Sequence, residues 1–331
     1  MKFTFIRIIL LSLFLFSTST HATTIKIATL SPDGTTWMKK MRMAAKEIAA
    51  RTDNRVKIKF YPGGVMGNEN AILRKMRINQ LQGAAVSSGA LDRYFKDASI
   101  YAMPFLFNSH EEAIYVRKKM DTLIIKGLEK GGLNSFGFAE SGFAYILSNT
   151  PVKAVAELRK LKTWIPDTES ARQASTAFKF KPIPLPFSDV LAALQTSLVN
   201  TIASSPIAAI ALQWHTQVKY LTEMPLLYGS GTLVISKKAM KKLKDPDRKI
   251  VNEIMSKTFK EIDAQNQKDN VAALAALKNQ GITFVKPDTK QLAEWKNLAK
   301  QGNENMVAKG FNSKKMYNLI NKYIAEFQKT K

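Results

Sequence analysis

Hydrophobic and polar positions alternate in two short segments near the start of the chain, and an apolar stripe at helical spacing lies between them. Residues 24–29 and 56–60 alternate, whereas residues 37–48 have the period of an amphipathic helix. A second helical segment over 72–81 leads to a short strand at 84–87. Strands that alternate with helices in this order form parallel sheets with right-handed crossovers.

The same alternation returns in the second half of the chain. A strand at 162–165 is stopped by Pro166 and is followed by a helix at 168–178. A long helical region with one apolar stripe is interrupted at Asp245-Pro246. Further short strands are predicted at 199–203, 231–235 and 282–285.

This pattern predicts an α/β protein with two lobes, each a mixed, mostly parallel sheet flanked by helices, and a long helix that spans the hinge. We expect lobe I over 23–145 and 229–280, and lobe II over 146–228 and 281–331. Ligands of open parallel sheets bind beyond the carboxyl ends of the strands. The cleft between the lobes is therefore the predicted site.

The first 22 residues are predicted to be a secretory signal peptide. Lys2 and Arg7 precede an apolar run from Ile8 to Phe16, and the small residues that end at Ala22 suit signal peptidase. An uncleaved anchor is the alternative, although this run is too short to span a bilayer by itself. We therefore expect a periplasmic protein that is cleaved near Ala22.

Charge and cysteine content narrow the class of protein further. Fifty Lys and Arg against 26 Asp and Glu give a net charge of +24, which would suit a nucleic-acid partner. The basic residues are scattered along helices and no recognition motif accompanies them, so no nucleic-acid partner is expected. Because cysteine is absent, disulfide scaffolds, thiolate nucleophiles and Cys-ligated metal sites are excluded.

No motif in the sequence predicts catalysis, a cofactor or a metal site. His110 and His215 are far apart, and neither has a metal-ligating partner at helical spacing. The nucleophile elbow, the P-loop and the dinucleotide fingerprint are absent, and Gly63 to Gly67 is interpreted as a turn. We expect a binding protein that is not an enzyme, with no cofactor and no metal.

Three blocks of the chain have a distinctive order and spacing: Leu161 to Pro166, Pro184 to Leu191 and Ala193 to Thr196. Through these blocks the chain resembles the DctP-type extracytoplasmic solute receptors of TRAP transporters (tripartite ATP-independent periplasmic transporters). The resemblance implies a two-lobed receptor that closes on one small-molecule ligand, in most members an organic acid. It also implies that the receptor delivers this ligand to one small and one large integral membrane subunit. We expect the receptor to be a monomer.

The chain departs from the resemblance at the positions that would hold a carboxylate. The arginine that pairs with the ligand in the family corresponds to Trp164. A basic residue two after a glycine corresponds to Ala144, after Gly142, and an asparagine before a proline corresponds to Ser205.

Two explanations stay open. Another cation replaces the arginine, with Arg172 the first choice and Arg93 or Lys162 after it. Alternatively, the ligand has an aromatic or apolar portion, with or without an acidic group, that stacks on aromatic side chains.

The candidate ligand-binding residues are of three kinds: aromatic rings, hydroxyls at strand ends and one arginine. Several have an alternative role, since Trp37 fits a helical core stripe, Ser204 and Ser205 can cap a helix, and Arg172 can be a surface charge. Truncating Trp164 to alanine is expected to weaken ligand binding with little loss of fold. The full set is Trp164, Phe187, Ser205, Ser204, Phe143, Tyr145, Ser88, Trp37 and Arg172.

Two other functions remain open at this point. One is an exported binding or sensory module without a dedicated transporter, and the other is an enzyme built on the same fold.

Overall fold

A computed structural model describes residues 22–330 of the chain. The predicted signal peptide lies outside the described residues except for Ala22. Among the described helices, none combines the length and the apolar character that a membrane crossing needs.

The β-α-β-α-β unit predicted near the N-terminus is present. Strand β1 (Thr23–Thr29) pairs in parallel with both β2 (Val56–Tyr61) and β3 (Gly83–Ser87). Helices α2 (Thr36–Arg51) and α3 (Glu69–Arg77) make the two crossovers. Their apolar faces are buried, so the periodicity in the sequence correctly marked the side of each helix that meets the sheet.

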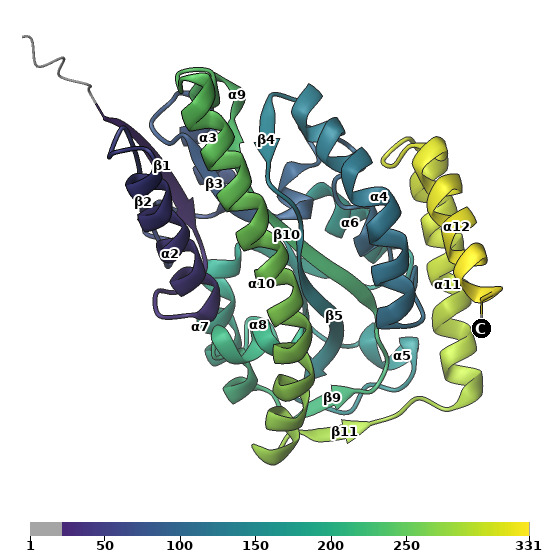
Figure 1. Ribbon diagram of the computed structural model, residues 1–331. Helices are drawn as coiled ribbons and strands as arrows, with labels where there is room; N and C mark the ends of the chain where they lie inside the picture. The colour runs from purple at the N-terminus through teal and green to yellow at the C-terminus, as the bar shows by residue number, and fades with distance from the viewer. Residues whose placement is uncertain (1–21, 331) are drawn as a thin grey trace, which may run out of the picture.

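Antiparallel strands extend this sheet. Strand β10 (Leu227–Ser236) pairs with β3 on one side and with β4 (Leu133–Ser135) and β5 (Ala139–Ser148) on the other. Helix α4 (His110–Lys130) covers one face of the sheet (Figure 1). The sequence pattern did not indicate α4 or β5, because β5 carries the polar and flexible run Glu140-Ser141-Gly142 inside an otherwise apolar strand.

Strand β5 connects the two halves of the molecule. Residues 139–144 pair with β10, whereas residues 145–148 pair with β8 (Thr201–Ser204) and β9 (Tyr220–Thr222). The strand order therefore runs without a break as β2-β1-β3-β10-β5-β8-β6-β7. We call the part built on β1–β4 and β10 the first half, and the part built on β6–β9 and β11 the second half.

The second half has its own parallel pairs and short helices. Strand β6 (Thr163–Pro166) pairs in parallel with β7 (Pro182–Leu185) and β8, and β11 (Thr283–Val285) pairs in parallel with β9. The mixed sheets flanked by helices agree with the predicted fold class. The helices of this half are α5 (Val155–Leu158), α6 (Glu169–Thr176), α7 (Val190–Gln195) and α8 (Pro206–Ala211).

Helix α10 (Asp245–Asn279) spans both halves, as predicted for the long helix (Figure 1). Near its start, Val251 and Phe259 are buried with the apolar face of α2, and near its end Leu277 is buried in the core of the second half. The interruption in the sequence pattern separates α10 from the short α9 (Lys237–Met240). Pro246 lies in the first turn of α10, where its missing N–H removes no hydrogen bond.

The C-terminal helices are distributed differently from the expectation. Helix α11 (Thr289–Ala308) contacts α5 and α6, but α12 (Lys314–Gln328) packs against α4 of the first half. Ile320 and Ile324 of α12 lie in the core of the first half. Segment 281–331 was expected in lobe II, so the tail returns instead to the first half, and the exact lobe boundaries stay a prediction.

Candidate functional site

One large cavity of about 880 Å³ lies between the two halves. On the first half its wall includes the segment after β1 and the segment after β3, and on the second half it includes the ends of β6 and β8. Residues of β5, β10 and α10 complete the wall. The cavity therefore lies where the sequence predicted a cleft, at the carboxyl ends of parallel strands.

Three aromatic rings form the wall of the second half and the core behind it. The rings of Trp164 and Phe187 lie with centroids 5.2 Å apart at 75°, and Trp164 and Trp214 lie 5.2 Å apart at 69°. The Trp164 Nε1 donates a hydrogen bond of 2.9 Å to the carbonyl oxygen of Leu185 on β7. Trp164 and Phe187 line the cavity, whereas Trp214 is packed behind them and is not part of the wall.

The position of Trp164 corrects one expectation. Its side chain is only 1% exposed and belongs to the core of the second half. Removal of a buried indole leaves a cavity and an unpaired Leu185 carbonyl, so truncation must also destabilise the fold. The expected weakening of ligand binding stays a prediction, but a truncation without loss of fold is not compatible with this packing.

Hydroxyl groups from both halves lie in the wall. Ser88 follows β3, Ser204 ends β8 and Ser205 follows it; all three are buried and line the cavity. The Ser205 Oγ accepts a hydrogen bond of 3.4 Å from the N–H of Ala208, so this hydroxyl caps α8 in addition to its place in the wall. Trp37, at the start of α2, also lines the cavity and is half-buried.

Two of the candidate aromatic residues are not brought to the cavity. The ring of Phe143 packs edge-on against Tyr228 at 5.4 Å, and Tyr145 packs into the core of the second half. Both side chains belong to cores rather than to the lining. Alternation along β5 explains this, because neighbouring side chains of a strand point to opposite faces.

The expected replacement cations also lie outside the lining. Arg172 is on the exposed surface of α6, where it forms an ion pair with Asp167. Lys162 is exposed and donates to the carbonyl oxygen of Ser197 at 3.1 Å, and Arg93 is exposed as well. A residue on a helix or strand next to the cleft therefore does not necessarily point its side chain into the cleft.

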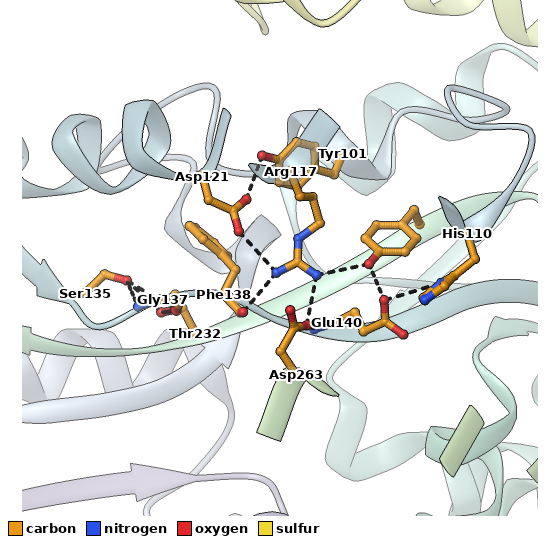
Figure 2. Close-up of polar contacts among 11 residues, drawn as sticks. Tyr101, His110, Arg117, Asp121, Ser135, Gly137, Phe138, Glu140, Thr232 and Asp263 are labelled. Atoms are coloured by element: carbon orange, nitrogen blue, oxygen red, sulfur yellow. Dashed lines mark hydrogen bonds and ion pairs between the residues drawn. The ribbon is translucent and has the colours of Figure 1, made fainter. Parts of the chain in front are cut away.

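A buried polar network next to the cavity was not foreseen from the sequence. Figure 2 shows the guanidinium of Arg117 at its centre. It donates to Asp263 Oδ1 at 2.9 Å, to Asp121 Oδ2 at 3.1 Å, to the Phe138 carbonyl at 2.9 Å and to the Tyr228 hydroxyl at 3.1 Å. These partners come from α4, β10, α10 and the segment before β5, so the network ties the first half to the long helix.

Glu140 on β5 connects this network to the cavity. The Tyr228 hydroxyl donates to its Oε2, and His110 Nδ1 lies 3.5 Å from the same oxygen (Figure 2). Glu140 is also a lining residue, and its Oε1 is buried without a hydrogen-bond partner among the described residues. Burial raises the pKa of Glu140 above its ordinary value.

Glu69 of α3 is a second acid in the wall, and it is half-buried. Its Oε1 accepts from the N–H of Ser87 at 2.5 Å and its Oε2 accepts from the Ser87 hydroxyl at 2.8 Å. Burial raises the pKa of Glu69, and the two hydrogen bonds from Ser87 oppose this rise. Neither Glu69 nor Glu140 has a local sequence signal, because their partners lie far away along the chain.

Within residues 22–330, no group of His, Asp and Glu side chains has an arrangement that could hold a metal ion. The two terminal nitrogens of Arg117 donate four hydrogen bonds inside the protein, which suits a structural role. What the site provides is an enclosed space with apolar walls and a few hydroxyl and carboxyl groups.

Comparison with known proteins agrees with this architecture. The family model described as bacterial extracellular solute-binding protein, family 7, matches residues 27–310. The chain belongs to this family. The matched part contains every residue that lines the cavity, because the lining residues lie between Thr29 and Met306.

Two curated relatives show how far the family has diverged. The sialic acid-binding periplasmic protein SiaP of Vibrio cholerae is 22% identical over 296 residues, which are 87% of this chain and 91% of that protein. The C4-dicarboxylate-binding periplasmic protein DctP of Rhodobacter capsulatus is 21% identical over 257 residues, which are 76% of this chain and 77% of that protein.

Solved structures share the fold. An extracytoplasmic solute receptor from Bordetella pertussis, which binds pyroglutamic acid, matches with a TM-score of 0.83 at 17% identity and covers 92% of this chain and 100% of its own. A TRAP periplasmic solute-binding protein from Shewanella oneidensis with bound succinate matches with a TM-score of 0.83 at 17% identity, over 92% and 99% of the two chains. The predicted resemblance and the two-lobed fold are confirmed.

Proposed function

We propose that this protein is the periplasmic receptor of a TRAP transporter, which captures a small organic molecule and delivers it to a small and a large integral membrane subunit. The observation that carries the proposal is the cavity itself, because both halves contribute to its wall. Family membership supports the same class of function.

Capture depends on contacts with both halves. A ligand that touches Ser88 of the first half and Phe187 of the second gains more contacts in the closed form than in an open one. Such a ligand shifts the population toward closure, and the membrane subunits recognise the closed form. A molecule that contacts one half alone binds without this shift.

Export follows from the N-terminal segment. Strand β1 begins at Thr23, so cleavage near Ala22 leaves every described strand and helix intact. The periplasmic location and the cleavage position belong to this proposal.

A thermal-shift screen of the refolded, ligand-stripped protein tests capture. Organic acids, sugar acids and neutral aromatic metabolites are added one by one, and a bound molecule raises the melting temperature by mass action. Small-angle scattering with and without each hit then measures closure, and a radius of gyration that falls on binding supports the proposal.

Uptake into cells tests delivery. Cells that express the receptor with both candidate membrane subunits are expected to accumulate the hit, and cells that lack either subunit are not. Binding without uptake would identify an exported sensory module instead. Mass spectrometry of the recovered hit is expected to show it unchanged, and a converted product would identify an enzyme.

A further inference from the structure

The lining of the cavity contains acidic side chains but no basic ones. Within residues 22–330, none of the residues that line it is Lys, Arg or His, although the chain carries 50 Lys and Arg. The ionisable groups in the wall are the acids Glu69, Glu140 and Asp269. We propose that the cavity takes an uncharged, largely apolar molecule that carries a hydroxyl or amide group, and that it discriminates against carboxylates. This inference rests on the proposed receptor function.

The neighbouring cations are already used by the protein. Arg117, behind Glu140, donates to Asp121, Asp263 and two further oxygens, so none of these bonds can be turned to a ligand without taking a hydrogen bond from one of these oxygens. Arg172 at the surface of α6 is paired with Asp167. A carboxylate in the cavity would therefore lose its water without a countercharge.

Helix N-termini act in the opposite direction. The first turns of α2, α6 and the short α8 line the cavity, and their partial positive charges favour a nearby oxygen. The caps Thr35 and Thr168 already accept the N–H groups of Met38 and Ala171. Such termini suit a carbonyl or hydroxyl oxygen, but their partial charges do not replace a guanidinium opposite the carboxyl groups of Glu69 and Glu140.

Three polar atoms in the wall lack a partner and indicate what the ligand supplies. Ser230 Oγ, Thr163 Oγ1 and Glu140 Oε1 are buried without a hydrogen-bond partner among the described residues, and all three residues line the cavity. Each side chain is at most 5% exposed. Buried polar atoms are normally satisfied, so a ligand with a hydrogen-bond donor for Glu140 and a group for the two hydroxyls completes the site.

Apolar side chains make up most of the surface that the wall presents to the cavity. Leu30, Val86 and Met103 contribute from the first half, and Phe178 and Ile207 contribute from the second, beside the aromatic rings of Trp164 and Phe187. A volume of about 880 Å³ lies in the upper part of the range for drug-sized ligands. The occupant is therefore larger and less polar than a small dicarboxylate.

Matched probes of one skeleton test the charge class directly. The ligand-stripped protein is titrated with the neutral fluorophore N-phenyl-1-naphthylamine, which is then displaced by 2-naphthamide, 2-naphthalenemethanol, 2-naphthoate and 2-naphthylmethylammonium. The amide or the alcohol is expected to displace the fluorophore at a concentration at least about tenfold lower than the acid, because the acid must be desolvated without a countercharge.

A tighter acid or a tighter ammonium compound overturns the inference, and so does a protein that binds neither the fluorophore nor any member of the set. Each of these results leaves the proposed function standing if the thermal-shift screen finds another ligand. If that screen finds no ligand but the neutral naphthyl probes bind, the proposed receptor function is overturned, whereas the preference of the cavity for uncharged molecules stands.

An added cation provides the reciprocal test. Phe187→Arg or Ala171→Arg places a guanidinium in the half-buried part of the wall. Either folded variant is expected to reverse the order, with the acid bound at least about fivefold tighter than the amide. Val271→Arg is the matched control, because Val271 is 75% exposed and outside the lining, and it should keep the wild-type order. An unchanged order in both folded lining variants contradicts the proposal.

Discussion

Gly89 of the first half faces Ser170 of the second half so closely that a Cβ atom on Gly89 would lie 3.0 Å from the Ser170 Oγ. This contact closes the cleft beside the cavity, since both residues belong to its wall. It is supported nearby by Asn70, whose Nδ2 lies 3.4 Å from the carbonyl oxygen of Asp167. The structure therefore represents a closed arrangement of the two halves.

A disulfide between these positions should hold the cleft closed. The chain contains no cysteine, so Gly89→Cys with Ser170→Cys introduces one defined pair at a separation compatible with a disulfide. Oxidation is expected to slow exchange of N-phenyl-1-naphthylamine at least about tenfold, because entry requires the halves to separate. Reductant should restore exchange, and the two single variants serve as controls. Rapid exchange in the oxidised double variant would show that the ligand enters by another route.

Trp164→Ala should destabilise the protein by about 3–5 kcal/mol, the usual effect of truncating a large buried aromatic side chain. The indole is 1% exposed and its Nε1 holds the Leu185 carbonyl. Urea unfolding followed by circular dichroism measures the loss. Trp37→Ala, a half-buried lining residue, should lose clearly less stability. Equal losses for the two variants would mean that the aromatic cluster does not support the second half.

Arg117→Met should also be strongly destabilising. The substitution leaves the Asp121 and Asp263 carboxylates without their cation, and breaking a buried ion pair in this way costs about 3–5 kcal/mol. Adding Asp263→Asn should recover part of this loss, which a double-mutant cycle measures. Arg51→Met removes the surface pair with Glu253 and should change the free energy of unfolding little. If Arg51→Met lost as much free energy of unfolding as Arg117→Met, the stabilising role assigned to the buried Arg117 network would be contradicted.

Asp92 should make stability depend on pH in the direction opposite to most carboxylates. Burial raises its pKa from 3.8 to about 6, and the nearby Ser99 and Ser170 lower it only in part because neither forms a hydrogen bond of normal geometry with it. The folded protein therefore binds a proton that the unfolded chain releases between these pH values. This contribution to stability is full below pH 3.8 and is lost as the pH rises through about 6.

Asp92→Asn should remove this dependence. At pH 7.5 the variant is expected to be more stable than the wild type by up to about 3 kcal/mol, and the difference should shrink toward pH 4. Melting temperatures across this range provide the measurement. Asp33→Asn is the control, because its hydrogen bond with Arg42 lowers the pKa of that exposed carboxyl, so no gain at neutral pH is expected. A constant difference for Asp92→Asn at all pH values would show that Asp92 is ionised throughout.

The sequence by itself determined the alternation of strands and helices, the class of fold and the family. Residues 24–29 and 37–48 carried enough periodicity to mark a strand and a helix, because each buries one apolar face in the same core. Such periodicity predicts an element wherever one face of that strand or helix is buried and the other is exposed. The aromatic positions Trp164 and Phe187 were found by a different route, through blocks that resemble a known family.

Only the tertiary structure decided which side chains reach the cavity and which charges meet. Tyr145 and Arg172 lie next to lining residues in the sequence, yet strand alternation and helix rotation turn them elsewhere. Arg117 and Asp263 are 146 positions apart, and no local pattern could pair them. Local patterns also could not predict that the described lining contains no cations. That absence depends on where each of many scattered basic residues points after folding.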